Sequence, residues 1–162
     1  MSIDSVEFRA ALGSLAAGVS VITAISKRES VGITVSSFTS LSLHPALILF
    51  CLDRKSSHCS AFNPRKKFAV NLLTQEQKHL AELFAGQQKK IWDQVPHEEN
   101  KHAVRILKNT LAALHCTVTK THKSGDHLII IGKIDMLGSI NKEARPLLYF
   151  RRHYHGLGAI VG

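Results

Sequence analysis

The chain has 162 residues, a hydrophobic share of 44% and a formal net charge of +9. This length fits a single domain with a sizeable core, which we expect to span residues 1–162. The longest apolar run, residues 46–52, is far shorter than the roughly 20 residues of a membrane span. The N-terminus lacks the basic start and apolar block of a secretory signal. The three scattered cysteines favour reduced thiols in a cytoplasmic protein.

The excess positive charge favours a negatively charged partner, such as nucleic acid, an anionic membrane surface or a phosphorylated small molecule. Aromatic residues make up only 6% of the chain, so a surface that stacks nucleic-acid bases is poorly supported. A solvated basic surface without any specific partner explains the charge equally well. Charge alone therefore does not choose among these readings.

The first predicted element is an N-terminal helix. Asp4 and Glu7 resemble a capping box, and we expect Gly18 to end the helix. Helical spacing predicts one apolar face, made of Phe8, Leu12 and Leu15.

Strands dominate the next part of the chain. Residues 19–25 and 31–37 predict a hairpin, because two β-branched runs flank a polar turn. Two further apolar runs predict strands over residues 46–52 and 66–73. Between them, residues 56–62 predict a short helix that ends before Asn63-Pro64.

A second capping box, formed by Thr74 and Gln77, predicts a helix over residues 75–85. Residues 87–109 are polar and give no clear pattern. The remaining alternating and apolar runs predict strands, the first two of them paired, over 111–122, 127–137 and 146–150. Because strands do not alternate regularly with helices, this order favours a mainly β fold, with an antiparallel sheet or barrel and a few peripheral helices.

The histidines do not predict a metal site. The pairs His58-Cys59 and His115-Cys116 are adjacent, and neighbouring residues of a strand point to opposite faces. No Cys-x-x-Cys accompanies them. The histidines of "HEENKH", residues 97–102, are five apart rather than four, so they do not share a helical face as zinc-protease histidines do.

Hydroxyl groups crowd the segment "GITVSSFTSLSLHPALILFCLDRKSS", residues 32–57. A buried strand divides it, and a basic loop with Arg54 and Lys55 follows that strand. Phosphate oxygens only accept hydrogen bonds, so hydroxyls, amides and cations suit them, and a helix starting after Ser56 could add its dipole. Serine and threonine also populate strand edges and loops without binding anything. The residues alone leave both readings open.

The stretch "TKTHKSGDHLIIIGKI", residues 119–134, raises a second question. A turn at Gly125 explains the glycine, and Asp126 can satisfy turn amides. A histidine at the start of such an apolar strand is less easily explained. His127 is either a partly buried strand-end residue or part of a binding site.

Both segments resemble the short-chain flavin reductase family, the NAD(P)H:flavin oxidoreductases that serve two-component monooxygenases. Residues 32–57 are similar to its signature. The resemblance continues in chain order through residues 68–73, 79–86, 125–134 and 146–158. It implies an FMN-binding split β-barrel, antiparallel with Greek-key connections, and normally a homodimer.

The resemblance implies a flavin site beside a nicotinamide site. Residues implied to line the flavin ring or ribityl chain are Thr34, Val35, Ser36, Ser37, Ser40, Cys51, Leu52 and Asp53. Those implied to hold its phosphate are Lys55, Ser56 and Ser57, and those that complete the pocket are Asn71 and Phe84. His127 is implied to contact the nicotinamide cofactor, with Arg151 and Tyr154 closing over it.

The implied activity is hydride transfer from NADH or NADPH to FMN or FAD, which supplies reduced flavin to a partner monooxygenase. The cofactors carry this chemistry, so the reaction needs no metal or protein nucleophile. A flavin-binding storage protein or oxidase, and a basic nucleic-acid-binding module, remain alternatives. One departure is that the family usually has glycine where this chain has Arg152.

Overall fold

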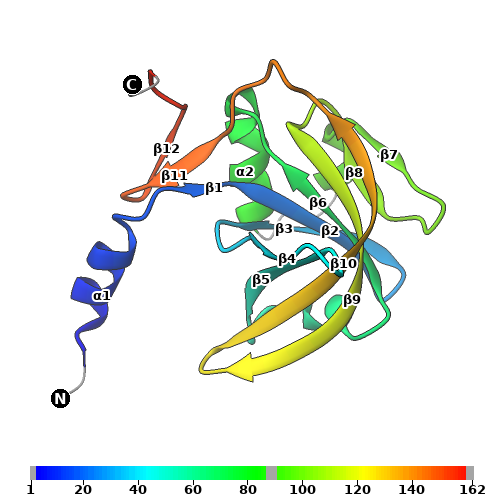
Figure 1. Cartoon of the computed structure of the whole chain (residues 1–162), viewed down its shortest axis with the longest axis horizontal. Coiled ribbons are helices and arrows are strands. Elements are labelled where there is room, and N and C mark those ends of the chain that lie inside the picture. Colours follow the sequence, from blue (N-terminus) through cyan, green and yellow to red (C-terminus); the bar gives the residue numbers. More distant parts are fainter. Residues whose placement is uncertain (1–2, 87–90, 160–162) are drawn as a thin grey trace.

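The computed structural model describes residues 3–86 and 91–159, and its secondary structure is mainly β (Figure 1). Seven antiparallel strands form the main sheet, in the order β3-β2-β6-β9-β10-β5-β4. Their bounds are β2 Ser20–Ser26, β3 Glu29–Val35, β4 Thr39–Ser42, β5 Leu47–Asp53, β6 Lys67–Leu72, β9 Ala112–Ser124 and β10 His127–Ile140. The predicted mainly β, antiparallel class is confirmed.

Strand β3, at one end of the main sheet, approaches β5, the strand next to the other end, without a backbone ladder between them. The side chain of Ser37, in the loop after β3, links the two, since its Oγ accepts a hydrogen bond from the Cys51 N–H at 2.9 Å. The same hydroxyl donates to the Cys51 carbonyl at 3.3 Å. The sheet therefore stays split between β3 and β5, an arrangement that is compatible with the expected split barrel, and Ser37 bridges this split at one end.

Aromatic residues fill the core of the main sheet. Phe50, Phe62 and Phe68 are buried and pack edge to face, with ring centroids 5.3 to 6.1 Å apart. Gly132 on β10 makes room for them, because a Cβ there would lie 2.4 Å from the Phe68 ring. Strand β5 shows the expected alternation, with Ile48, Phe50 and Leu52 facing this core.

Helix α2, Lys78–Ala85, covers one end of the sheet. The capping box is confirmed, with the Gln77 side chain accepting from the Thr74 N–H at 3.2 Å. A 3-10 turn over Gln75–Gln77 precedes the helix, so the predicted helical segment is present with a tighter first turn. Its buried residues, Leu80, Ala81 and Phe84, pack in a second core with strand β2.

Helix α1, Ser5–Leu12, projects from the body of the molecule, and none of its residues is buried (Figure 1). The Asp4 cap is present, accepting from the Glu7 N–H at 3.2 Å. The predicted end at Gly18 is wrong, since the helix stops at Gly13. Residues Ala17–Gly18 instead form strand β1, because their backbone pairs with a distant strand near the C-terminus.

Two small sheets complete the fold. Strands β1, β11 (Leu148–Phe150) and β12 (His153–His155) form one of them beside α1. The other is the hairpin of β7 (His97–Glu99) and β8 (Arg105–Leu107), which follows a 3-10 turn over Ile91–Gln94. The predicted helix over residues 56–62 is only a 3-10 turn, Cys59–Phe62. No helix in the described ranges is long and apolar enough to cross a membrane.

Candidate functional site

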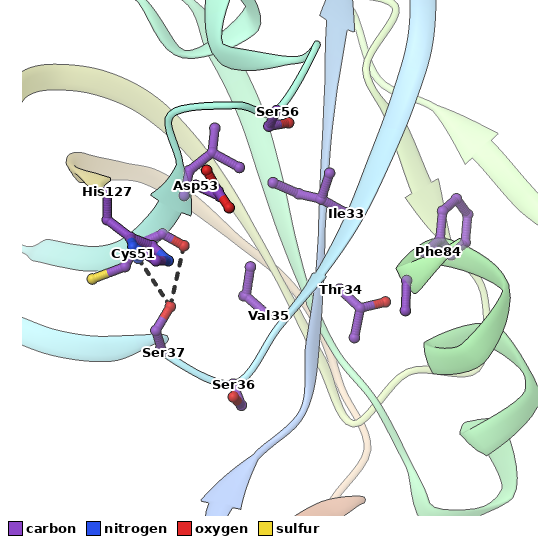
Figure 2. Close-up of a pocket in the computed structure, with 12 residues that line it drawn as sticks. Ile33, Thr34, Val35, Ser36, Ser37, Cys51, Asp53, Ser56, Phe84 and His127 are labelled. Atoms are coloured by element: carbon purple, nitrogen blue, oxygen red, sulfur yellow. Dashed lines mark hydrogen bonds between the residues drawn. The ribbon is translucent and has the colours of Figure 1, made fainter. Parts of the chain in front are cut away.

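A cavity of about 470 Å³ lies where the sheet is split, between β3, β5 and the end of α2 (Figure 2). His127, the first residue of β10, joins these walls at one side. The twelve residues that line the cavity are Ile33, Thr34, Val35, Ser36, Ser37, Cys51, Leu52, Asp53, Ser56, Phe84, Ala85 and His127. Residues distant in the sequence thus meet at one site.

The wall formed by β3 and α2 is held by two close contacts. The Thr34 hydroxyl donates to the Ala81 carbonyl on α2 at 2.7 Å. The ring of Phe84 lies against Gly32, where a Cβ would come within 2.5 Å of it. Glycine at this position therefore lets the aromatic ring rest directly on the strand, and the Thr34 hydroxyl has a structural partner of its own.

The opposite wall is the end of β5 and the turn after it. The Asp53 carboxylate accepts from the Lys55 N–H at 2.8 Å, and the Ser56 N–H donates to the Asp53 carbonyl at 3.0 Å. These bonds fold the turn so that Ser56 lines the cavity. The Ser56 hydroxyl accepts from the His58 N–H at 3.2 Å.

His127 is placed by strand register, because it lies opposite Asp53 of β5 and Ser124 of β9. Its Nδ1 lies 2.7 Å from an Asp126 carboxylate oxygen. The hydrogen bond and the positive charge of His127 lower the pKa of Asp126 below its ordinary value. The side chain of Asp126 therefore contacts His127, whereas we expected it to satisfy turn amides.

Arg54 fastens the turn before His127 to the turn after β5. Its backbone N–H donates to the Asp126 carbonyl at 2.9 Å, and its side-chain Nη1 donates to the Gly125 carbonyl at 3.0 Å. Gly125 itself has a φ of 57°, which glycine adopts without strain. The two turns at this side of the cavity are thus fixed relative to each other.

Six predicted binding residues do not line this cavity. They are Ser40, Lys55, Ser57, Asn71, Arg151 and Tyr154. Lys55 and Ser57 flank the lining residue Ser56 in the turn after β5. Ser40 lies on the exposed edge strand β4, opposite Ile48. For these three residues the cofactor role remains a prediction from the resemblance.

Asn71 is fully buried in the core rather than placed at the cavity. Its amide nitrogen donates to the Val21 carbonyl at 3.0 Å and to Thr23 Oγ1 at 3.3 Å. Its amide oxygen accepts from the Leu107 N–H at 2.9 Å. Asn71 therefore ties β6 to β2 and β8, and it is not part of the cavity wall that it was expected to complete.

Arg151 and Tyr154 belong to the β11–β12 hairpin. The Arg151 N–H donates to the Gly13 carbonyl at 2.8 Å, next to α1. The Tyr154 ring packs against Tyr149 at 5.3 Å. Burial, with Tyr149 and Glu82 of α2 nearby, raises the pKa of Tyr154. Neither residue lines the cavity, and the expectation that they close over the nicotinamide cofactor stays a prediction.

Two lining residues, Ile33 and Ala85, were not predicted. Ile33 precedes Thr34 on β3, and Ala85 follows Phe84 at the end of α2. Both are neighbours of predicted residues, and their apolar side chains carry no chemical signal by themselves. The contact between β3 and α2 places them at the cavity.

The thiols and histidines form no metal centre in the described ranges, where no group of three or more His, Cys, Asp or Glu side chains could hold an ion. The three cysteines are free. Cys51 lines the cavity, whereas Cys116 is buried, and burial, with Asp135 nearby, raises its pKa to about 12. Cys116 therefore stays protonated at neutral pH.

Comparison with known proteins agrees with this geometry. The model of the "Flavin reductase like domain" family matches residues 12–158. The chain is 33% identical over 156 residues to the reductase subunit HsaB of a flavin-dependent monooxygenase from Mycobacterium tuberculosis, covering 96% of this chain and 83% of that protein. It is 34% identical over 146 residues to the NADH-dependent FMN reductase SmoA of Agrobacterium fabrum, covering 90% and 82%.

A solved structure of flavin reductase HpaC, complexed with NADP+, superposes with a TM-score of 0.88 at 29% identity, covering 97% of this chain and all of that chain. The family match spans most of the sequence. The chain therefore belongs to the flavin reductase like family, and the family predicted from the sequence is confirmed.

Proposed function

We propose that the chain is an NAD(P)H-dependent flavin reductase whose flavin, FMN or FAD, binds in the cavity between β3, β5 and α2. NADH or NADPH is the hydride donor, and the reduced flavin is supplied to a partner monooxygenase. Family membership and the activities of the similar proteins support this oxidoreductase assignment. The observation that carries the site is that nine of the twelve residues lining one cavity are predicted flavin-site residues, and a tenth, His127, is the predicted nicotinamide contact.

The lining residues fit a flavin in size and chemistry. A volume of about 470 Å³ lies within the usual range for small-molecule sites. Apolar side chains, Ile33, Val35 and Leu52 with the Phe84 ring, suit a planar aromatic ring. Hydroxyls and strand-end amides around Ser36 and Ser56 suit the polar ring edge and the phosphate.

A bound flavin supplies the ring that accepts the hydride, so the chain has to bind and orient rather than attack. Ser37 fixes the width of the split, and Thr34 fixes α2 against β3. His127 can hydrogen-bond the nicotinamide, its ribose or its phosphates at one side of the cavity. The contact with Asp126 engages Nδ1 of His127, which leaves Nε2 for the cofactor.

The test is a matched pair of cavity variants. Ser36→Trp places a bulky ring in the cavity, whereas Thr39→Trp places it on the exposed edge strand β4, at a residue with no predicted cofactor role. We expect wild type and Thr39→Trp to oxidise NADH or NADPH only when flavin is added, and Ser36→Trp to lose both flavin binding and this rate. Equal flavin affinity in all three proteins would contradict the site. Flavin binding without nicotinamide oxidation would instead indicate a storage protein.

We also propose that the chain forms a homodimer. Large apolar side chains are exposed on α1, where Phe8 and Leu12 are 53% and 54% exposed, and on β10 at Met136 and Leu137. Surfaces of this kind commonly mark protein interfaces.

Sedimentation equilibrium tests the dimer and should give twice the chain mass for wild type. A monomeric wild-type protein would contradict the proposal, and Leu12→Glu should shift a dimer toward monomer.

A reducing, cytoplasmic location is part of the proposal. Its support is that the three cysteines form no disulfide with one another. Localisation of a fluorescent fusion in the native host tests it.

A further inference from the structure

Trp92, which does not line the cavity, packs behind one of its walls. It lies in the 3-10 turn Ile91–Gln94, and its ring centroid is 5.1 Å from that of Phe84, at an interplanar angle of 55°. Phe84 lines the cavity and rests on Gly32 of β3. The Phe84 ring is therefore supported by two elements, strand β3 and the turn that carries Trp92.

Trp92 is bonded to the same strand on which Phe84 rests. Its indole N–H donates to the Ser30 carbonyl at 2.8 Å. Ser30 lies two residues before Gly32, and β3 continues directly into the lining residues that begin at Ile33. A single side chain thus connects β3, through a hydrogen bond, to α2, through an aromatic contact.

The β7–β8 hairpin holds Trp92 from other sides. The Arg105 guanidinium lies 5.1 Å from the indole centroid and pairs with Glu99 at 3.2 Å. The His97 ring meets the indole edge to face at 5.3 Å. Its Nδ1 lies 2.7 Å from the Val95 carbonyl. The hairpin therefore limits the motion of Trp92, although it makes no wall of the cavity.

We propose that Trp92 is a positioning residue of the flavin site, which holds the Phe84 ring as the rigid wall against which the flavin binds. This inference rests on the proposed flavin cavity. Without the indole, the Phe84 ring could rotate away from β3, and the cavity would lose part of its fixed shape. The affinity for flavin should then fall. The affinity for the nicotinamide cofactor should not, because its proposed contact is His127, on another side of the cavity.

Trp92→Leu tests this role, with Trp92→Phe as the conservative variant. We expect Trp92→Leu to raise the Kd and KM for FMN by between about twofold and tenfold, the range that an aromatic pair contributes. The KM for the nicotinamide should stay unchanged. Trp92→Phe keeps a ring beside Phe84 but loses the N–H bond, so it should recover most of the flavin affinity.

Val104→Ala is the matched control for stability. Val104 is 1% exposed, and it packs with Ala69 and Ile106 beside the same hairpin, in a cluster that includes neither Phe84 nor Trp92. This control should lower the melting temperature without changing the Kd for FMN. If Trp92→Leu does the same, or raises both KM values equally, the positioning role is wrong.

Phe84→Ala separates the two proposals. A raised Kd for FMN in Phe84→Ala but not in Trp92→Leu would overturn the role of Trp92 and leave the cavity in place. No change in either variant would overturn both. Because Trp92 is the only tryptophan of the chain, its emission gives an independent measurement. Saturating FMN should quench it, and unchanged emission would contradict the proximity that the proposal requires.

Discussion

The β9–β10 and β11–β12 hairpins have the same local design at different places in the fold. Each has a two-residue turn followed by a histidine as the first residue of the next strand, His127 in one and His153 in the other. His127 lies at the cavity because β10 also pairs with β5, opposite Asp53. His153 belongs to a three-stranded sheet with β1, and its Nδ1 lies 2.9 Å from the Arg151 carbonyl. The surrounding sheet, rather than the turn, decides which histidine can meet a cofactor.

The two turns also differ in which residues adopt a positive backbone φ. Gly125 has a φ of 57°, which costs glycine nothing. In the other turn, Arg151 and Arg152 have φ values of 46° and 67°. Positive φ at both positions is the requirement of a type I′ turn, which asparagine and glycine usually meet. The departure at Arg152 therefore places a strained residue where the family usually has glycine.

The largest predicted effect is a difference in catalytic efficiency between variants of the two histidines. We expect His127→Ala to lower kcat/KM for the nicotinamide by about tenfold to a hundredfold, as loss of a hydrogen bond to a charged or polar ligand group does. His153→Ala, its counterpart in the other hairpin, should leave steady-state kinetics unchanged. Equal kinetics for the two variants would remove His127 from the site.

Gly125→Ala should destabilise the β9–β10 turn. Its left-handed backbone costs a residue with a Cβ roughly 1–2 kcal/mol, although the mutation also reduces the entropy of the unfolded chain. Chemical denaturation should show a lower free energy of unfolding. Gly158→Ala is the control, since its backbone carries no positive φ and a Cβ there meets nothing within 4 Å. Equal losses in the two variants would contradict the turn geometry.

Arg152→Gly should instead raise the free energy of unfolding. Relief of the left-handed strain should stabilise the fold by about 0.5–1 kcal/mol after the entropy gained by the unfolded chain is subtracted. The same denaturation experiment measures it. A destabilised Arg152→Gly variant would mean that the arginine side chain contributes more than its backbone costs.

The elements that the sequence predicts well are those whose signals are local. Apolar alternation located β9 and β10, and the capping box of Thr74 and Gln77 located α2. The residues at the cavity come mostly from one such local segment, between Ile33 and Ser56, whose two strands face each other across the split.

The differences between expectation and structure involve partners that are distant in the chain. The end of α1 was missed because β1 forms by pairing with β11. Asn71 has the polarity of a binding residue, but its partners Val21 and Leu107 come from other strands and make it part of the core. The positions of Arg151 and Tyr154 likewise depend on the separate sheet of β1, β11 and β12. No local sequence pattern indicates where that sheet lies relative to the cavity.

The smallest predicted effect is a pH dependence of stability, which arises from Asp135 in the β9–β10 hairpin. Burial opposes ionisation of Asp135, but hydrogen bonds from Thr117 and Lys67, with the Lys67 charge, outweigh it and lower its pKa below the usual 3.8. The folded state therefore has the lower pKa. Its stabilising contribution is fully present above about pH 4 and is lost as pH falls through the folded pKa.

Melting temperatures of wild type and Asp135→Asn across this range measure that contribution. The difference between the two proteins should be small at neutral pH, because the pair is partly exposed to solvent. It should shrink further as the pH falls below about 4. A difference that grows in acid would contradict the assigned direction.

A crystal structure of the protein with saturating FMN tests the central claim most directly. We predict density for the flavin ring between β3 and β5, against Phe84, with its phosphate near Ser56 and His127 beside the open face. Flavin bound at another surface, or a cavity that stays empty while FMN is bound in solution, would contradict the account.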